Sequence, residues 1–200
     1  MDSLASAGRR AGRLAATAAN ARALLLAILL AVAARPAPAQ QPAEAPPPAD
    51  PADVASIDAI IAALYDVISG PAGEERDWDR FRSLFVPGAR LIPVAVPRGG
   101  GPARAVVGSV EDYIARSGPI LVERGFFERE IARSTERFGH IAHAFSTYAS
   151  YWKRDDAEPF ARGINSIQLM YDGTRWWIVT VYWDSERPGQ PIPAEYLRGH

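Results

Sequence analysis

The residues best suited to chemistry are four polar side chains among apolar neighbours in the last third of the chain: His140, Asn165, Gln168 and Asp184. A histidine and an aspartate that meet in space can transfer protons as a general acid and base. An asparagine beside them can orient a carbonyl group through its side-chain amide. We therefore take His140 and Asp184 as candidate catalytic residues, and His140 and Asn165 as candidate pocket residues.

Each of these residues also has a structural interpretation, because buried polar groups are usually hydrogen-bonded for structural reasons. His140 can begin a strand near solvent, and Asn165 can pair with the backbone. Gln168 can be exposed or lie at a subunit interface. Asp184 can be a carboxylate at the end of a strand, paired with Arg187.

Metal and cofactor chemistry has little support. The chain contains no cysteine, which excludes zinc–thiolate sites, iron–sulfur clusters, thiol catalysis and disulfides. His140 and His143 are three residues apart, so on a strand they face opposite sides and cannot share a metal. The glycine-rich stretch 97–102 lacks the Lys-Ser/Thr ending of a phosphate loop. We expect no metal and no cofactor, and the net charge of −1 argues against nucleic acid as a partner.

The N-terminal segment has the three parts of a secretory signal peptide. Arginines between positions 9 and 22 precede an uninterrupted apolar run at 23–34, and Ala37-Pro38-Ala39 supplies a small-x-small cleavage pattern. The apolar run is shorter than the roughly 20 residues of a membrane-spanning helix. We predict a signal peptide over residues 1–39, a periplasmic or secreted protein, and no stable membrane anchor after cleavage. An uncleaved N-terminal anchor is the alternative.

Cleavage changes the charge and the working length. Removal of 1–39 takes away five Arg and one Asp, which leaves 17 basic and 22 acidic residues. Residues 40–52 are a Pro/Ala-rich linker that has few side chains to bury. The folded domain is therefore predicted over 53–198, which is long enough for one substantial core.

Hydrophobic periodicity predicts helices first and strands later. Asp53 to Ser69 has an apolar stripe at helical spacing with Asp53 as a possible N-cap, 77–85 forms a short aromatic helix, and Ser109 with Asp112 forms a capping box. The predicted strands span 89–96, 103–107, 126–138, 140–153, 161–171 and 175–185, and Asp172-Gly173 marks a hairpin. This order predicts an α+β fold, a cone-shaped roll in which three N-terminal helices pack on a curved antiparallel sheet.

The last predicted strand is apolar on both faces. By alternation, Trp176, Ile178 and Tyr182 share one face, and Trp177 and Trp183 lie on the other. A sheet with one wet face would alternate apolar with polar residues. We therefore expect both faces to be covered, one by helices and the other by a second subunit in a homodimer. The alternative is a monomer whose tail, 188–197, folds over the sheet.

Several segments of the sheet region resemble the nuclear transport factor 2-like (NTF2-like) superfamily. They are Phe138 to Tyr148, the stretch Gly163-Ile164-Asn165, and the ending that runs from Asp172-Gly173 through Trp176-Trp177 to Val179. The segments are most similar to those of exported, SnoaL-like bacterial members. The resemblance implies a cone with a pocket at its open end and, in many members, dimerisation through the outer sheet face. It does not fix a function, because relatives include isomerases, cyclases, dehydratases and accessory domains.

An isomerase mechanism of the ketosteroid type uses an aspartate base and a tyrosine in an apolar cone. Tyr65 has a first-helix position similar to that tyrosine, which makes it a third weak catalytic candidate. The resemblance places the base near 91–94, and this stretch (LIPV) holds no carboxylate. A buried tyrosine with a satisfied hydroxyl is the simpler interpretation of Tyr65.

Aromatic side chains in the domain predict an apolar pocket. The predicted lining is Tyr65, Trp78, Phe81, Tyr113, His140, Asn165, Trp176 and Tyr182. We predict a domain that binds a small apolar molecule, with an acid–base enzyme or a non-catalytic dimeric interaction module as alternatives. The charged run Glu128-Arg129-Glu130 is interpreted as part of a solvated edge with cross-strand ion pairs.

Overall fold

The computed structural model describes residues 45–98 and 101–198. The predicted signal peptide, 1–39, and the first part of the linker lie outside the described residues. Within the described ranges, no helix is both long and apolar enough to cross a membrane. Asp50 caps a short helix that begins at Pro51, two residues before the predicted domain boundary at 53.

Within the described residues, four helical segments precede the main strands or lie between them. They are α2 (Pro51–Val54), α3 (Ile57–Ile68), α4 (Trp78–Ser83) and α5 (Val110–Arg124). The predicted helix from Asp53 is divided in two: Ser56 is the N-cap of α3, and its side chain accepts a hydrogen bond from the Ala59 N–H. Asp53 instead accepts hydrogen bonds from the Arg80 guanidinium, so its predicted capping role is wrong.

Helix α5 begins at the predicted capping box, in which the Ser109 and Asp112 side chains satisfy each other's backbone N–H groups. Pro119 lies inside the helix rather than ending it. The helix ends at Arg124, and Gly125 is its C-cap with a positive φ of 74°. Glycine adopts this backbone conformation at lower cost than other residues do.

Six strands form one sheet with the order β2-β1-β6-β5-β4-β3. The strands are β1 (Phe85–Ala95), β2 (Arg104–Ala105), β3 (Phe127–Phe138), β4 (Ile141–Tyr151), β5 (Ala161–Tyr171) and β6 (Trp176–Ser185). The predicted meander of β3 to β6 is confirmed as antiparallel throughout. The sheet is not wholly antiparallel, however, because β1 pairs with β6 in parallel.

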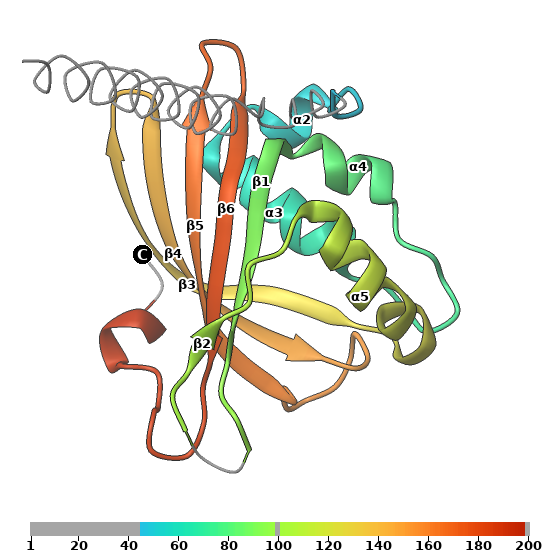
Figure 1. Cartoon of the computed structure of the whole chain (residues 1–200), viewed down its shortest axis with the longest axis vertical. Coiled ribbons are helices and arrows are strands. Elements are labelled where there is room, and N and C mark those ends of the chain that lie inside the picture. Colours follow the sequence, from blue (N-terminus) through green and yellow to red (C-terminus); the bar gives the residue numbers. More distant parts are fainter. Residues whose placement is uncertain (1–44, 99–100, 199–200) are drawn as a thin grey trace, which may run out of the picture. The chain divides into compact units, whose positions relative to one another are not determined.

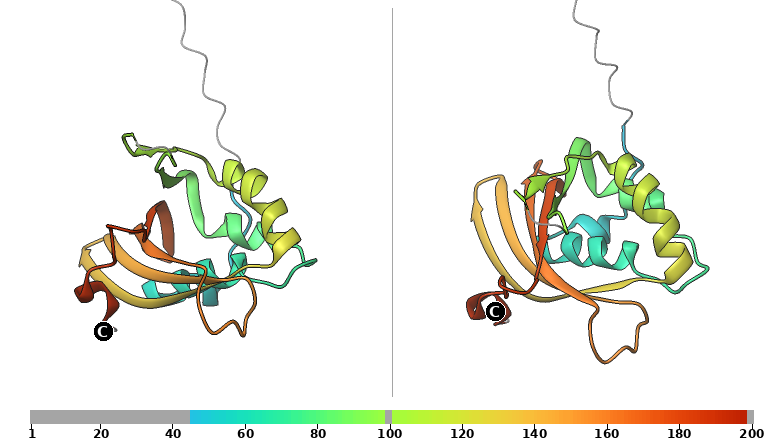
Figure 2. Two further views of the ribbon diagram at one scale, coloured as in Figure 1. Left: turned by 90° about the horizontal axis from the view of Figure 1, so that it is seen from below. Right: turned by 60° about the horizontal axis from the view of Figure 1, so that its bottom comes forward.

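The sheet curves around α3, which lies on its concave side together with α4 and α5 (Figure 1, Figure 2). Side chains of α3 make the centre of the core, where Ile60 and Ile61 are fully buried against strand residues such as Ile167 and Ile178. Helices on one face of a curved, mostly antiparallel sheet confirm the predicted α+β class.

A β-bulge in β6 changes which side chains face the core. Leu169 pairs with Ile178 and Gln168 with Thr180, so Val179 is an extra residue on β6. Strict alternation therefore fails after Ile178. Trp176 and Ile178 face inward before the bulge, and Val181, Trp183 and Ser185 line the interior after it. The predicted face of Tyr182 is wrong for this reason.

The C-terminal tail lies across part of the outer sheet face. It ends in the short helix η1 (Ala194–Leu197), which lies outside the curve of the sheet (Figure 2). The Thr147 hydroxyl donates a 2.6 Å hydrogen bond to the Tyr196 carbonyl. The Tyr196 ring packs edge-on against Phe145 with 5.0 Å between centroids. The tail thus covers part of the apolar outer face by itself, whereas Tyr182 remains 43% exposed.

Candidate functional site

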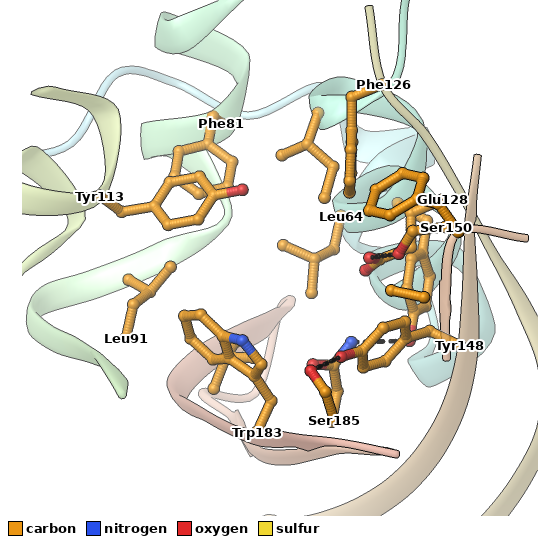
Figure 3. A pocket seen from close by; sticks show the side chains of 16 residues that line it. Leu64, Phe81, Leu91, Tyr113, Phe126, Glu128, Tyr148, Ser150, Trp183 and Ser185 are labelled. Atoms are coloured by element: carbon orange, nitrogen blue, oxygen red, sulfur yellow. Dashed lines mark hydrogen bonds between the residues drawn. The ribbon is translucent and has the colours of Figure 1, made fainter. Parts of the chain in front are cut away.

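A cavity of about 240 Å³ lies between the helices and the concave face of the sheet. It is near the ends of β4 and β6 and the starts of β3 and β5. The lining comes from every layer of the fold: Leu64, Tyr65, Ile68, Phe81, Leu91, Tyr113, Phe126, Glu128, Tyr148, Ser150, Phe160, Ala161, Asn165, Val181, Trp183 and Ser185. The wall is therefore mostly aliphatic and aromatic, with a few polar groups (Figure 3).

Glu128 is the carboxylate of this cavity. It lies at the start of β3, where its N–H donates to the Ser69 hydroxyl, 3.0 Å away. Its side chain crosses to β4 and accepts a 2.7 Å hydrogen bond from the Ser150 hydroxyl. Burial raises the pKa of Glu128 to about 7, against the opposing effect of hydrogen bonds from Ser150 and Asn165. Glu128 can therefore gain or lose a proton near neutral pH.

Tyr65 belongs to a hydrogen-bonded network beneath the cavity. The Asn165 amide donates to the Tyr65 hydroxyl at 3.0 Å. The Ser146 hydroxyl donates at 2.5 Å to Glu130, which leaves the Tyr65 hydroxyl as the donor in its 2.7 Å bond to Ser146. Burial raises the pKa of Tyr65 well above its usual range. Because the Tyr65 hydroxyl already donates its hydrogen bond to Ser146, it fits the structural interpretation better than a role as hydrogen-bond donor to an oxyanion.

The opposite wall carries Tyr113 of α5 and Trp183 of β6, whose rings meet edge-on at 6.5 Å. Tyr113 also stacks on Phe81, with 5.3 Å between centroids. Its hydroxyl points into the cavity (Figure 3) and has no hydrogen-bond partner among residues 45–98 and 101–198. A bound molecule can therefore accept a hydrogen bond from Tyr113 without displacing a protein contact.

The structure brings only some of the predicted pocket residues together. Tyr65, Phe81, Tyr113 and Asn165 line the cavity. Trp78 lies one layer away, packed against Phe81 and against Gly118 of α5. An added Cβ at Gly118 would lie 3.1 Å from the indole ring, so glycine lets Trp78 pack closely against α5.

The other three predicted lining residues are elsewhere, so the prediction is wrong for His140, Trp176 and Tyr182. Trp176 is buried at the far end of the sheet, below the Arg137 guanidinium. Tyr182 is on the outer face because of the bulge in β6. His140 is exposed in the β3–β4 turn, where its Nδ1 is 2.8 Å from the Tyr171 carbonyl.

His140 and Asp184 do not form a catalytic pair. His140 contacts Tyr171 at one end of β5, whereas Asp184 pairs with Ile164 near the other end. Seven residues of strand separate these positions, which is more than about 20 Å. Asp184 is paired with Arg187 at 2.6 Å, as its structural interpretation predicted.

Sequence reasoning missed Glu128, which was placed on a solvated edge. The register shows why the edge prediction is wrong: Glu128 pairs with Ser150 and Glu130 with Tyr148, both on the inward face of β4. The available signal is the alternation of Ser146, Tyr148 and Ser150 on one face of β4, since serine hydroxyls there can donate hydrogen bonds to acidic side chains of a neighbouring strand.

The arrangement can hold a small molecule and exchange a proton with it through Glu128. Leu91, near the stretch where the resemblance placed an isomerase base, contributes an apolar wall on the other side of the cavity (Figure 3). Among the described residues, no group of three or more His, Asp or Glu side chains is arranged to hold a metal ion.

No family model and no curated protein matches the sequence. Solved structures are similar in fold at low identity. An NTF2-like protein of unknown function from Silicibacter pomeroyi is 16% identical over 66% of this chain and 94% of its own, with a TM-score of 0.44. An NTF2-like superfamily protein from Salmonella enterica is 17% identical over 70% of this chain and 92% of its own, with a TM-score of 0.44. An NTF2-like protein of unknown function from Shewanella baltica is 11% identical over 64% of this chain and 89% of its own, with a TM-score of 0.42.

Proposed function

We propose that this protein binds a small, largely apolar molecule in the cavity between α5 and the sheet. The observation that carries the proposal is an apolar, aromatic cavity into which a few polar groups converge, among them Glu128 and the Tyr113 hydroxyl. Such cavities are the usual form of small-molecule sites. A purely structural interaction module would gain stability by filling this space with side chains.

The size of the cavity limits the ligand. Its volume of about 240 Å³ is below the roughly 300–1,000 Å³ of sites for drug-sized molecules. The ligand is therefore about the size of one substituted ring. Its apolar body lies against residues such as Leu64, Leu91 and Val181, and its polar group faces Glu128.

The proposal is tested by native mass spectrometry of protein purified from its own compartment. We expect a retained small molecule that is lost from Leu91→Trp, which fills the cavity. Val107→Trp is the control, because Val107 is 63% exposed and does not line the cavity. Equal retention by both variants would contradict binding in this cavity.

Acid–base catalysis is the second candidate function, because the Glu128 carboxyl in the cavity has a pKa of about 7. A general base operates best when its pKa is near the working pH. Deuterium uptake at the α-carbon of 2-indanone, measured by NMR in D₂O, tests for this capacity. Catalysed exchange that disappears in Glu128→Gln supports an enzyme, and exchange at the uncatalysed rate in both proteins opposes it.

We further propose that the chain is a SnoaL-like exported protein, periplasmic or secreted, with no stable membrane anchor after cleavage. The support is the three-part pattern of residues 1–39. Expression of the full chain in a bacterium with fractionation tests this. A product found outside the cytoplasm with an N-terminus near Gln40 is expected, whereas full-length chain in the membrane fraction would indicate an uncleaved anchor.

A homodimer through the outer sheet face also remains a proposal. Its support is the exposed aromatic surface around Tyr182, next to the part of that face covered by the tail. Light scattering at micromolar concentration distinguishes a homodimer from a monomer by its mass. A dimeric mass that becomes monomeric in Tyr182→Glu supports the proposal, and a monomeric mass for the unmodified protein contradicts it.

A further inference from the structure

The Glu128 carboxylate has no cationic partner within the part of the chain that the structure describes. None of the ion pairs within residues 45–98 and 101–198 includes Glu128. Glu130, the acidic residue of the Tyr65 network, is in contrast 3.3 Å from the Arg133 guanidinium. Its neighbours across the cavity and the sheet are hydroxyl, amide and aromatic groups. A half-buried carboxylate without a cation is costly to ionise, since the charge has lost part of its water.

The rest of the wall is suited to a positive charge. Six aromatic rings besides Tyr65 line this small volume: Phe81, Tyr113, Phe126, Tyr148, Phe160 and Trp183. The faces of aromatic rings carry partial negative charge, so a cation within about 6 Å of a ring centroid is attracted to it. In Figure 3, Tyr113 and Trp183 lie on one side of the cavity, and Glu128 and Tyr148 lie on the other. A cationic group near Glu128 is therefore enclosed by negative potential on several sides.

We propose that the ligand is a small organic cation, an amine with an apolar body, whose ammonium group pairs with Glu128. The inference rests on the proposed function and names its ligand class. The amine supplies the positive charge that no described residue provides at this position, and its N–H groups can donate to Glu128. A neutral molecule of the same shape would leave the carboxylate unpaired.

Binding of an amine is coupled to the proton on Glu128. The titratable groups that face Glu128 are Tyr65 of α3, Tyr113 of α5 and Tyr148 of β4, each of which is neutral at pH 7 because burial raises its pKa. Glu130 follows on the same strand. The amine favours the ionised carboxylate, whose pKa is about 7 without a ligand. Binding should therefore release about half a proton near pH 7 and weaken as the pH falls below the pKa.

Calorimetric titration with benzylamine and its neutral isostere benzyl alcohol tests the inference. Near pH 8 we expect the amine to bind about tenfold or more tightly than the alcohol, and this preference to shrink about tenfold near pH 5.5. Titration in two buffers of different ionisation enthalpy measures the released proton. Glu128→Gln removes both the preference and the proton release, while Glu136→Gln, an exposed change on the same strand, keeps them.

The outcomes separate the inference from the function on which it rests. If the alcohol binds as tightly as the amine in the unmodified protein, the cation inference is overturned while the cavity remains a binding site. If neither compound binds, both proposals are overturned. If the amine preference survives in Glu128→Gln, a different group selects the charge and the inference is wrong.

Discussion

At the residue scale, Glu128 should make the stability of the protein depend on pH. Its pKa is about 7 in the fold and 4.5 in the absence of perturbation. Between these values the unfolded chain binds fewer protons than the folded one, so the contribution of Glu128 to stability falls as the pH rises. The unmodified protein should therefore lose unfolding free energy on the order of 3 kcal/mol between pH 5 and pH 8. Urea unfolding at the two pH values should show that this loss is absent in Glu128→Gln. Equal pH dependence in Glu128→Gln and in the unmodified protein would contradict the buried carboxylate.

Two of the cavity tyrosines, Tyr65 and Tyr113, differ in the hydrogen bonds that their hydroxyls make. Removal of the Tyr65 hydroxyl takes one hydrogen bond from Asn165 and one from Ser146, so Tyr65→Phe should cost about 1–3 kcal/mol of unfolding free energy. Tyr113→Phe removes a hydroxyl that has no protein partner in the described ranges, and its cost should be under about 0.5 kcal/mol. Denaturant unfolding of both variants measures the difference. Equal costs would contradict the assigned network.

At the element scale, one arginine connects α3 to α5. The Arg76 side chain is only 6% exposed, and its guanidinium donates to carbonyls at the end of α3, in the following loop and at Leu121 of α5. Gly70 leaves the space for it, because an added Cβ would be 2.7 Å from Arg76. Burial lowers the pKa of Arg76, although an arginine stays charged.

A lysine cannot reproduce this set of hydrogen bonds, because it lacks the planar fork of donors. We expect Arg76→Lys to destabilise the fold by about 2–4 kcal/mol. Arg104→Lys, an exposed change on β2, should have no measurable effect. Thermal and urea unfolding of the two variants provide the comparison. A neutral Arg76→Lys variant would show that the carbonyls find other donors.

The elements themselves could be predicted where their signals are local. The hairpin at Asp172-Gly173 is confirmed. Its signal is local because the Asp172 carboxylate accepts hydrogen bonds from the Thr174 and Arg175 N–H groups within the turn. The capping box of α5 is local in the same way. The bulge at Val179 could not be predicted, since it depends on how β5 and β6 pair. That single extra residue exchanges Tyr182 for Trp183 in the cavity.

The candidate site was harder to predict than the fold because its residues come from separate strands and helices. Phe81 and Tyr113 could be predicted as lining residues because they are aromatic side chains on helices with local sequence signals. Glu128 was not, because its inward direction follows from the register between β3 and β4. A charged run is usually solvated, and only the pairing with Ser150 shows that this one turns inward.

At the scale of the whole molecule, the tail should protect the outer sheet face. Tyr196→Ala removes the ring that packs on Phe145. We expect faster hydrogen exchange in the tail and in the β4 residues beneath it, around Thr147. Glu195→Ala, an exposed neighbour, is the control. Unchanged exchange in Tyr196→Ala would mean that the tail contact contributes little.

The most direct measurement of the central claim follows the indole N–H signals by NMR as benzylamine and benzyl alcohol are added near pH 8. Trp183 lines the cavity, whereas the Trp177 indole donates to Asp172 in the turn at the far end of β6. The account predicts that the Trp183 signal moves with added compound and the Trp177 signal does not. A Trp183 signal that neither compound moves would contradict a ligand site in this cavity.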